Sequence, residues 1–145
     1  MPNFTGNLKG ANTTQSAVTC TDTPGHQLIL RAGTAQQTCS DPHFNNTRHS
    51  SWSTADMVHG KGHERGYFVN EHANGDHEGG EYEARVSTSS NGQMTMEGTW
   101  KYTHGTGQFS GISGSGKFKG HMTSPSEVEV SFEGSYQLRA GTKVA

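Results

Sequence analysis

The sequence predicts an all-β protein, folded as a closed antiparallel barrel of about eight strands. Gly is abundant at 20 of 145 residues, hydrophobic residues make up 28% and the formal net charge is -2, which is typical of sheet proteins with many tight turns. Apolar and polar residues alternate along several segments, as in strands with one buried face. About eight such strands would close into a barrel or a two-sheet sandwich. Glycines beside inward aromatics, such as Gly98 near Trp100, favour the barrel.

The chain length is typical of one domain, residues 1–145, and its first third gives the weakest strand signals. Residues 1–14 are polar and rich in Gly and Asn, and we interpret them as a flexible arm or an edge strand. Strands are predicted over residues 16–21 and 26–32, separated by a turn at Thr23-Pro24-Gly25. The Leu-Ile-Leu centre of the second predicts a buried strand. Residues 40–51 are predicted to be a loop.

Regular alternation begins at Trp52. Strands are predicted over residues 52–60, 63–72, 80–88, 93–103, 109–112, 117–122 and 127–139. The last has the clearest period of two, since Val128, Val130, Phe132, Gly134, Tyr136 and Leu138 share one face. Asn74-Gly75 and Asn91-Gly92 are each expected to form a type I′ hairpin turn, because Asn and Gly readily adopt positive φ.

A Gly-x-Gly-x-Phe-x-Gly pattern occurs twice, at residues 105–111 (GTGQFSG) and 114–120 (GSGKFKG). We interpret the two copies as successive strand corners, with Phe109 and Phe118 sealing the core. Residues 111–117 also satisfy G-x-x-x-x-G-K, the phosphate-loop pattern. Phe118 stands where that motif needs Ser or Thr, and a strand follows instead of a helix, so a nucleotide site is not expected.

These residues resemble the allene oxide cyclase-like barrels, a calycin-type family that includes the dirigent-like proteins and bacterial relatives. The resemblance covers residues 62–138. It is carried by GYFVNEHANGDHEGGEYEARV, GTWKYTHGTGQFSGISGSGKFKG and MTSPSEVEVSFEGSYQL. It implies an eight-stranded antiparallel barrel, often trimeric, with an apolar axial cavity. The plant cyclases hold a fatty-acid epoxide there, but their catalytic groups cannot be matched residue by residue, so that activity is not carried over.

Charge and hydropathy argue against several partners. Lys and Arg number 11 and are scattered, so no face for nucleic acid is expected. No apolar run approaches the ~20 residues that span a bilayer. We expect no cofactor and no metal site, with the nine histidines at the surface. The acidic cluster Glu71, Glu78, Glu81 and Glu83 is expected to form a charged outer hairpin.

The two cysteines, Cys20 and Cys39, both lie in polar, Thr-rich surroundings, which favours a disulfide over two separate thiols. Such a bridge could stabilise a chain this poor in aliphatic residues by roughly 3 kcal/mol. The expected localisation is therefore secreted or periplasmic, on the assumption that the sequence starts at the mature chain. A cytoplasmic protein with two reduced thiols is the alternative.

Five aromatic residues are expected to face the barrel interior: Tyr82, Trp100, Tyr102, Phe132 and Tyr136. They either pack the core or line a cavity that holds one small ligand. The leading hypothesis is non-catalytic binding of a small apolar molecule by a barrel that could be a dimer or trimer. One alternative is an isomerase or cyclase acting on a hydrophobic substrate, which requires an ionisable group deep inside. Another is a structural or interaction protein with a filled barrel.

Overall fold

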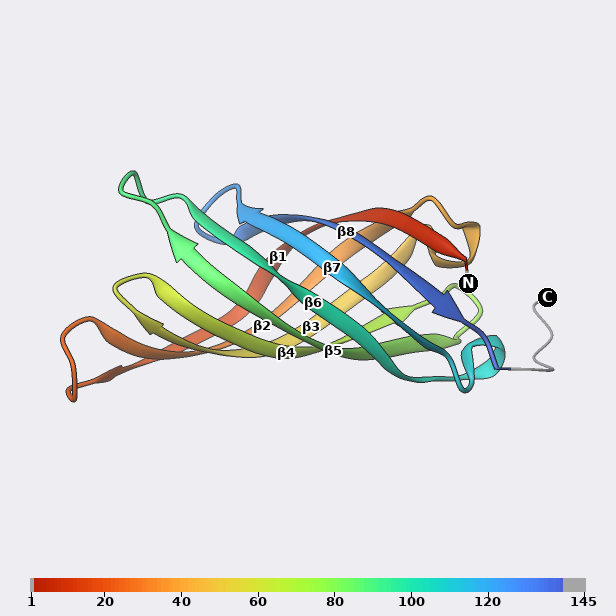
Figure 1. The fold of residues 1–145 in the computed structure, drawn as a ribbon, viewed down its shortest axis with the longest axis horizontal. Helices are drawn as coiled ribbons and strands as arrows, with labels where there is room; N and C mark the ends of the chain where they lie inside the picture. Colours follow the sequence, from red (N-terminus) through yellow and green to blue (C-terminus); the bar gives the residue numbers. More distant parts are fainter. Residues whose placement is uncertain (1, 140–145) are drawn as a thin grey trace.

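The computed structural model describes residues 2–139 and shows a closed barrel of eight antiparallel strands, as predicted (Figure 1). Each strand pairs with the next, and β1 pairs with β8 to close the sheet. The strands are β1 (Asn3–Cys20), β2 (His26–Cys39), β3 (Thr47–Val58), β4 (Lys61–Glu71), β5 (His77–Thr88), β6 (Met94–Gly105), β7 (Ser113–Met122) and β8 (Glu127–Gln137), with 3-10 turns η1 (Pro42–Phe44) and η2 (Gly107–Phe109). No helix in the described part is long and apolar enough to cross a membrane.

The first hairpin is longer than predicted. β1 is one strand of 18 residues, so residues 3–14 are not a flexible arm, and residue 1 lies outside the described residues. The register of β1 against β2 shifts between Asn12 and Thr14, which leaves Thr13 as an extra, bulged residue. β1 pairs with β8 only as far as Ala11, whereas its pairing with β2 continues to Cys20. The far half of this hairpin projects at the barrel end opposite the start of β1 and the end of β8 (Figure 1).

The Leu-Ile-Leu run of β2 is not a fully buried strand. Leu28 and Leu30 are 46% and 59% exposed on the outer face, while Ile29 is half-buried and packs against the core. A closed single-layer sheet buries one face only, so three consecutive apolar residues cannot all be inside. The inward phase of β2 continues through Arg31, which lines the cavity described below.

The two Asn-Gly hairpins lie where they were predicted, but their turn type differs. Gly75 and Gly92 have φ of 91° and 85°, whereas Asn74 and Asn91 are not among the residues with positive φ. Gly75 N–H donates to His72 O at 3.0 Å and Gly92 N–H to Ser89 O at 2.9 Å. Each turn is thus a type I turn followed by a left-handed glycine, which suits a slightly longer hairpin connection.

The inner wall alternates rows of glycine with aromatic rings. Trp100, Gly116 and Gly134 lie side by side on β6, β7 and β8. In the next row Gly98 of β6 is paired with Phe118 of β7, and Phe132 of β8 is paired with Gly6 of β1. A Cβ on Gly134 would lie 2.4 Å from Trp100 Cζ2, so the indole needs the absence of a side chain there.

The two copies of the Gly-x-Gly-x-Phe pattern have different roles. The first copy forms η2, where Gly107 and Gly111 have φ of 57° and 77°, so residues 109–112 are not a strand. The second copy lies inside β7 and is not a corner. Phe109 and Phe118 are both buried in the core, at 0% and 8% exposure.

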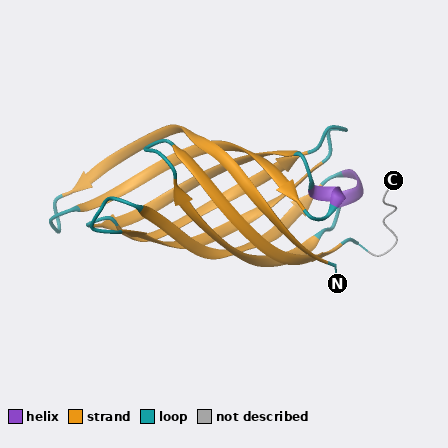
Figure 2. Ribbon diagram, turned by 90° about the horizontal axis from the view of Figure 1, so that it is seen from above, coloured by secondary structure: helices purple, strands orange, loops and turns teal. Residues whose placement is uncertain are grey.

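One end of the barrel is closed by aromatic side chains. Phe44 of η1 and Phe109 of η2 are fully buried, with ring centroids 5.5 Å apart. Tyr136 packs edge-on against Phe44 at 4.8 Å, and His72 stacks on Phe109 at 4.4 Å. Figure 2 shows a helical turn at this end of the barrel. The interior can therefore be reached only from the opposite end or through the wall.

Candidate functional site

The barrel encloses a cavity of about 210 Å³. It extends from the closed end to the rim formed by the β5–β6 and β7–β8 turns, where Met94, Met122 and Pro125 line it. Its volume is about seven times the ~30 Å³ that a water molecule occupies in the liquid, and below the ~300–1,000 Å³ of drug-sized pockets. A compact molecule would fit inside.

The cavity has one polar and one apolar wall. Strands β2 to β5 supply the polar wall, with Arg31, Gln37, His49, Ser51, Ser53, Glu64, Asn70 and Tyr82. Strands β6 to β8 supply the apolar wall, with Met94, Met96, Phe118, Met122, Val128, Val130 and Phe132. The interior is thus amphipathic, whereas the family resemblance had implied an apolar cavity.

The strongest polar feature is a buried ion pair between Arg31 of β2 and Glu64 of β4. Arg31 Nη1 donates to Glu64 Oε1 at 2.5 Å, and the two side chains are 10% and 6% exposed. Arg31 Nε also donates to Gln15 Oε1 at 3.1 Å. The Tyr82 hydroxyl donates weakly to Glu64 Oε2 at 3.4 Å.

Burial shifts the proton affinities of this group. It raises the pKa of the Glu64 carboxyl, and the nearby Arg31 guanidinium limits that rise. Burial, reinforced by the Glu64 charge, raises the pKa of the Tyr82 phenol further above neutrality. The phenol therefore remains a hydrogen-bond donor at all ordinary pH values. Glu64 is a carboxyl next to a cavity whose environment favours holding a proton, which is a property of general acids.

A second buried polar chain runs from the cavity toward the closed end. His49 Nδ1 lies 2.8 Å from Asn70 Oδ1, and Asn70 Nδ2 donates to Glu78 Oε1 at 3.1 Å. Glu78 Oε2 also bonds His72 Nε2. Burial lowers the pKa of His49, so its imidazole is neutral near pH 7. Because an amide oxygen only accepts, His49 carries its proton on Nδ1 and leaves Nε2 as a free base.

Two expectations about charged residues were wrong here. Glu78 is 0% exposed and does not belong to a charged outer hairpin, because it lies on the same inward face of β5 as Tyr82 and Ala84 and pairs with the buried Asn70 of β4. His49 and His72 are not surface histidines, since both side chains are enclosed by the polar chain and by Phe68 and Phe109.

Four of the five predicted aromatic residues line the cavity: Tyr82, Trp100, Tyr102 and Phe132. The fifth, Tyr136, lies in the closed end, where its hydroxyl donates to Asp41 Oδ2 at 2.6 Å. Trp100 is 9% exposed. Among residues 2–139, its Nε1 is the buried side-chain polar atom with no hydrogen-bond partner. A buried donor left unpaired costs about 1–3 kcal/mol; neighbouring atoms cover this nitrogen, so an acceptor could bond to it only after the indole moves.

The predicted disulfide between Cys20 and Cys39 is wrong. Both thiols are free, and they lie at opposite ends of the first hairpin. Cys20 is paired with His26 at one end of β2 and Cys39 with Gly6 at the other. At about 3.3 Å per strand residue, this separates them by roughly 40 Å, far beyond the ~7 Å limit between bridged Cα atoms. The expectation that the protein is secreted or periplasmic was based on this disulfide and is no longer supported by it.

The sequence analysis missed Arg31, Glu64 and the buried role of Glu78. Glu64 lies on the same inward face of β4 as Gly66 and Phe68. This alternation was the one signal that could have identified Glu64 as a buried residue. Its partner is 33 residues away on another strand, which no local pattern reveals.

Together, the fold and the cavity define a closed antiparallel barrel with an amphipathic interior and one plugged end. Comparisons with protein-family models, with curated proteins and with solved structures found no match to this chain.

Proposed function

We propose that this barrel binds a small amphipathic molecule in its interior. The observation that carries this proposal is the 210 Å³ cavity with one polar and one apolar wall. A ligand with a carbonyl, ether or hydroxyl oxygen would place that oxygen against the hydrogen-bonding side chains of β2 to β5. Its hydrocarbon part would lie against the Met, Val and Phe side chains of β6 to β8. The alternative of a filled, purely structural barrel is less well supported, because such a barrel would have no cavity of this size.

The resemblance to the allene oxide cyclase-like barrels agrees with this proposal, since that family has an axial cavity. The ligand would differ in size and polarity from a fatty-acid epoxide. The enclosed volume is small, and the polar wall contains the charged Arg31 and Glu64. Short-chain oxygenated hydrocarbons, such as monoterpene alcohols and alkylphenols, fit these limits better than long acyl chains.

Tryptophan fluorescence tests the proposal directly. The chain has two tryptophans, and Trp52 is 49% exposed on the outer face. In the Trp52→Phe variant all tryptophan emission comes from Trp100. We expect it to change saturably with monoterpene alcohols, alkylphenols or medium-chain fatty acids. Val130→Phe, which fills the cavity from its apolar wall, should weaken the response at least tenfold.

The matched control for Val130→Phe is Ser131→Phe. Ser131 is the next residue of β8 and faces outward, because side chains alternate along a strand. Its substitution should leave the ligand response unchanged. Absence of any response across the panel, or equal loss in both variants, would refute cavity binding.

A second candidate function is isomerisation or cyclisation of the bound molecule. It is favoured by one observation, the Glu64 carboxyl with raised pKa beside the cavity. Such a group could protonate an epoxide or a carbonyl oxygen. Product analysis of bound ligands with wild-type protein and Glu64→Gln separates the two functions. Turnover by the wild-type protein that Glu64→Gln abolishes would support catalysis. Recovery of unchanged ligand from both proteins would mean that the barrel binds the molecule without converting it.

We also propose that the barrel self-associates through its outer face. Leu30, Trp52 and Tyr67, on neighbouring strands β2, β3 and β4, are 59%, 49% and 64% exposed. Exposed apolar groups gathered on one face often mark an interface. Light scattering coupled to gel filtration should give the mass of a dimer or trimer, and Trp52→Lys should give a monomer. A monomeric wild-type protein at high micromolar concentration would contradict this.

A further inference from the structure

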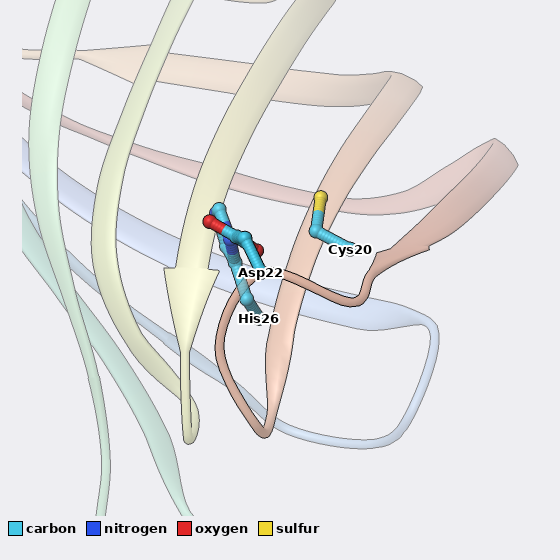
Figure 3. Close-up of side chains that lie close together, drawn as sticks. All are labelled: Cys20, Asp22 and His26. Carbon is cyan, nitrogen blue, oxygen red and sulfur yellow. The ribbon is translucent and has the colours of Figure 1, made fainter.

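Three side chains with metal-binding atoms lie together at the turn between β1 and β2 (Figure 3). Cys20 ends β1, His26 begins β2, and Asp22 lies in the turn that joins them. One ligand atom from each, a sulfur, a ring nitrogen and a carboxylate oxygen, lie within 4.8 Å of one another. Thr23-Pro24-Gly25 reverses the chain between them, and Gly25 has a φ of 76°. The turn therefore brings Asp22 back toward the imidazole.

The bulge in β1 places Cys20 on the same face as His26. Before the bulge, even-numbered residues such as Phe4 and Leu8 face the interior. After it, odd-numbered Gln15 faces inward and bonds Arg31. One extra residue reverses the facing of every side chain beyond it, so Cys20 points outward. His26 reaches Asp56, whose side chain is 65% exposed, and is therefore on the outer face as well.

His26 is held from both sides by carboxylates. Its Nδ1 lies 2.7 Å from Asp22 Oδ1, and its Nε2 lies 2.6 Å from Asp56 Oδ1 on β3. Metal-binding histidines typically donate their second ring N–H to a carboxylate, which fixes the ring and its tautomer. Asp56 is placed to accept that N–H. The opposite nitrogen, Nδ1, then faces Asp22 and the Cys20 side of the turn.

We propose that Cys20, Asp22 and His26 bind a divalent metal ion of the zinc type, with Asp56 as the orienting partner of His26 and water as the fourth ligand. Sulfur, nitrogen and oxygen together favour Zn²⁺ or Co²⁺ over Mg²⁺ or Ca²⁺. Zinc–ligand distances of about 2.0–2.3 Å in a tetrahedron place ligand atoms about 3.3–3.7 Å apart, within the 4.8 Å found here.

Metal binding releases protons and requires small movements, since ligand atoms that lie within 4.8 Å of one another must reach tetrahedral separations of about 3.3–3.7 Å. Asp22 must withdraw from Nδ1 by somewhat less than about 1 Å, to a tetrahedral separation. Its side chain is 63% exposed in the turn, so nothing packed has to move with it. The ion takes the place of the thiol proton of Cys20 and of the proton on Nδ1, and both protons pass to solvent.

Cobalt titration of the untagged, reduced protein tests the proposal. Co²⁺ bound to a thiolate gives a sulfur-to-metal charge-transfer band in the near ultraviolet, and exposed histidines alone do not give this band. We expect one equivalent of Co²⁺ to produce the band and Zn²⁺ to remove it. Cys20→Ser should abolish the band, whereas Cys39→Ser, at the far end of the same hairpin, should retain it. Both sites lie in strands, and circular dichroism of each metal-free variant checks that the barrel is folded.

The role of Asp56 has its own readout. Asp56→Asn removes the carboxylate that orients His26 but leaves all three ligands in place. Loss of such a partner weakens metal binding by about 10- to 100-fold, and the competition titration with Zn²⁺ measures this directly. Absence of the band in the wild-type protein, its persistence in folded Cys20→Ser, or its loss in folded Cys39→Ser would each overturn the metal site. Unchanged affinity in Asp56→Asn would overturn the orienting role.

Discussion

Replacing Arg31 by Met is expected to lower the free energy of unfolding, because it leaves the buried Glu64 carboxylate without its ion-pair partner. The substitution keeps most of the side-chain volume but removes the guanidinium that faces the carboxylate at 2.5 Å. Glu64 is then left in the barrel interior with the hydroxyls of Tyr82, at 3.4 Å, and of Ser53 as neighbouring donors. Removing one partner of a buried pair costs about 3–5 kcal/mol. Typical domains are stable by about 5–15 kcal/mol, so the variant should still fold at low temperature.

Urea unfolding measures this loss. With a slope of about 2 kcal/mol per molar urea, the midpoint at pH 7 should fall by about 2 M. The loss should also depend on pH. The pKa of Glu64 in the folded protein is already raised above the ordinary value of 4.5 by burial, and removal of Arg31 raises it further. A raised carboxyl pKa destabilises the fold when the group is ionised, so the penalty is complete above the folded pKa and absent below about 4.5.

The difference between Arg31→Met and the wild type should therefore shrink as the pH falls from 7 toward 4.5. The double variant Arg31→Met/Glu64→Gln should recover most of the lost stability at pH 7, because no buried charge is left. The reasoning fails if the loss is the same at pH 4.5 and pH 7, or if the double variant is no more stable than Arg31→Met alone.

Four further predictions concern other parts of the barrel. Phe44→Ala should remove the end plug and lower the free energy of unfolding by about 3–5 kcal/mol in urea; a loss below 1 kcal/mol would contradict the plug. Gly134→Ala should cost about 1–3 kcal/mol and shift the Trp100 emission, whereas unchanged emission would mean that the indole does not lie on this glycine. NMR titration should show His49 with a pKa below 6.5, so that its contribution to stability is present above pH 6.5 and is lost as the pH falls below it; an ordinary pKa would refute its burial. Both cysteines should react with a thiol reagent, Cys39 more slowly because burial raises its pKa, and a mass two hydrogens lower under non-reducing conditions would refute the free thiols.

The second half of the fold could be predicted from sequence because the two faces of each of its strands differ strongly in polarity. In β4 to β8, Glu, Lys and Arg alternate with Gly, Val and aromatic residues, so the buried face is plain. In β1 and β2 both faces carry Thr, Asn, Gln and Ala, and the period of two is hidden. The 18-residue length of β1 therefore could not be predicted.

The candidate site was predictable only for its aromatic part. Tyr82, Trp100, Tyr102 and Phe132 follow from alternation within single strands. Arg31 and Glu64 stabilise one another across two strands, and each alone has the appearance of a surface charge. Tyr136 faces inward but lies at the closed end, because it stands next to the last residue of β8, where it packs against Phe44.

The bulge at Thr13 has a consequence for how this chain can vary. It divides β1 into a segment that completes the barrel and a segment whose outward side chains include Cys20. Deletion of Thr13 would leave a regular ladder, with Asn12 opposite Gly33 and Thr14 opposite Ala32, and would keep Gln15 beside Arg31 and Cys20 beside His26. Deletion of two residues there would exchange the inner and outer side chains of the projecting half and separate both pairs. Related sequences are therefore expected either to keep the bulge or to lack this one residue.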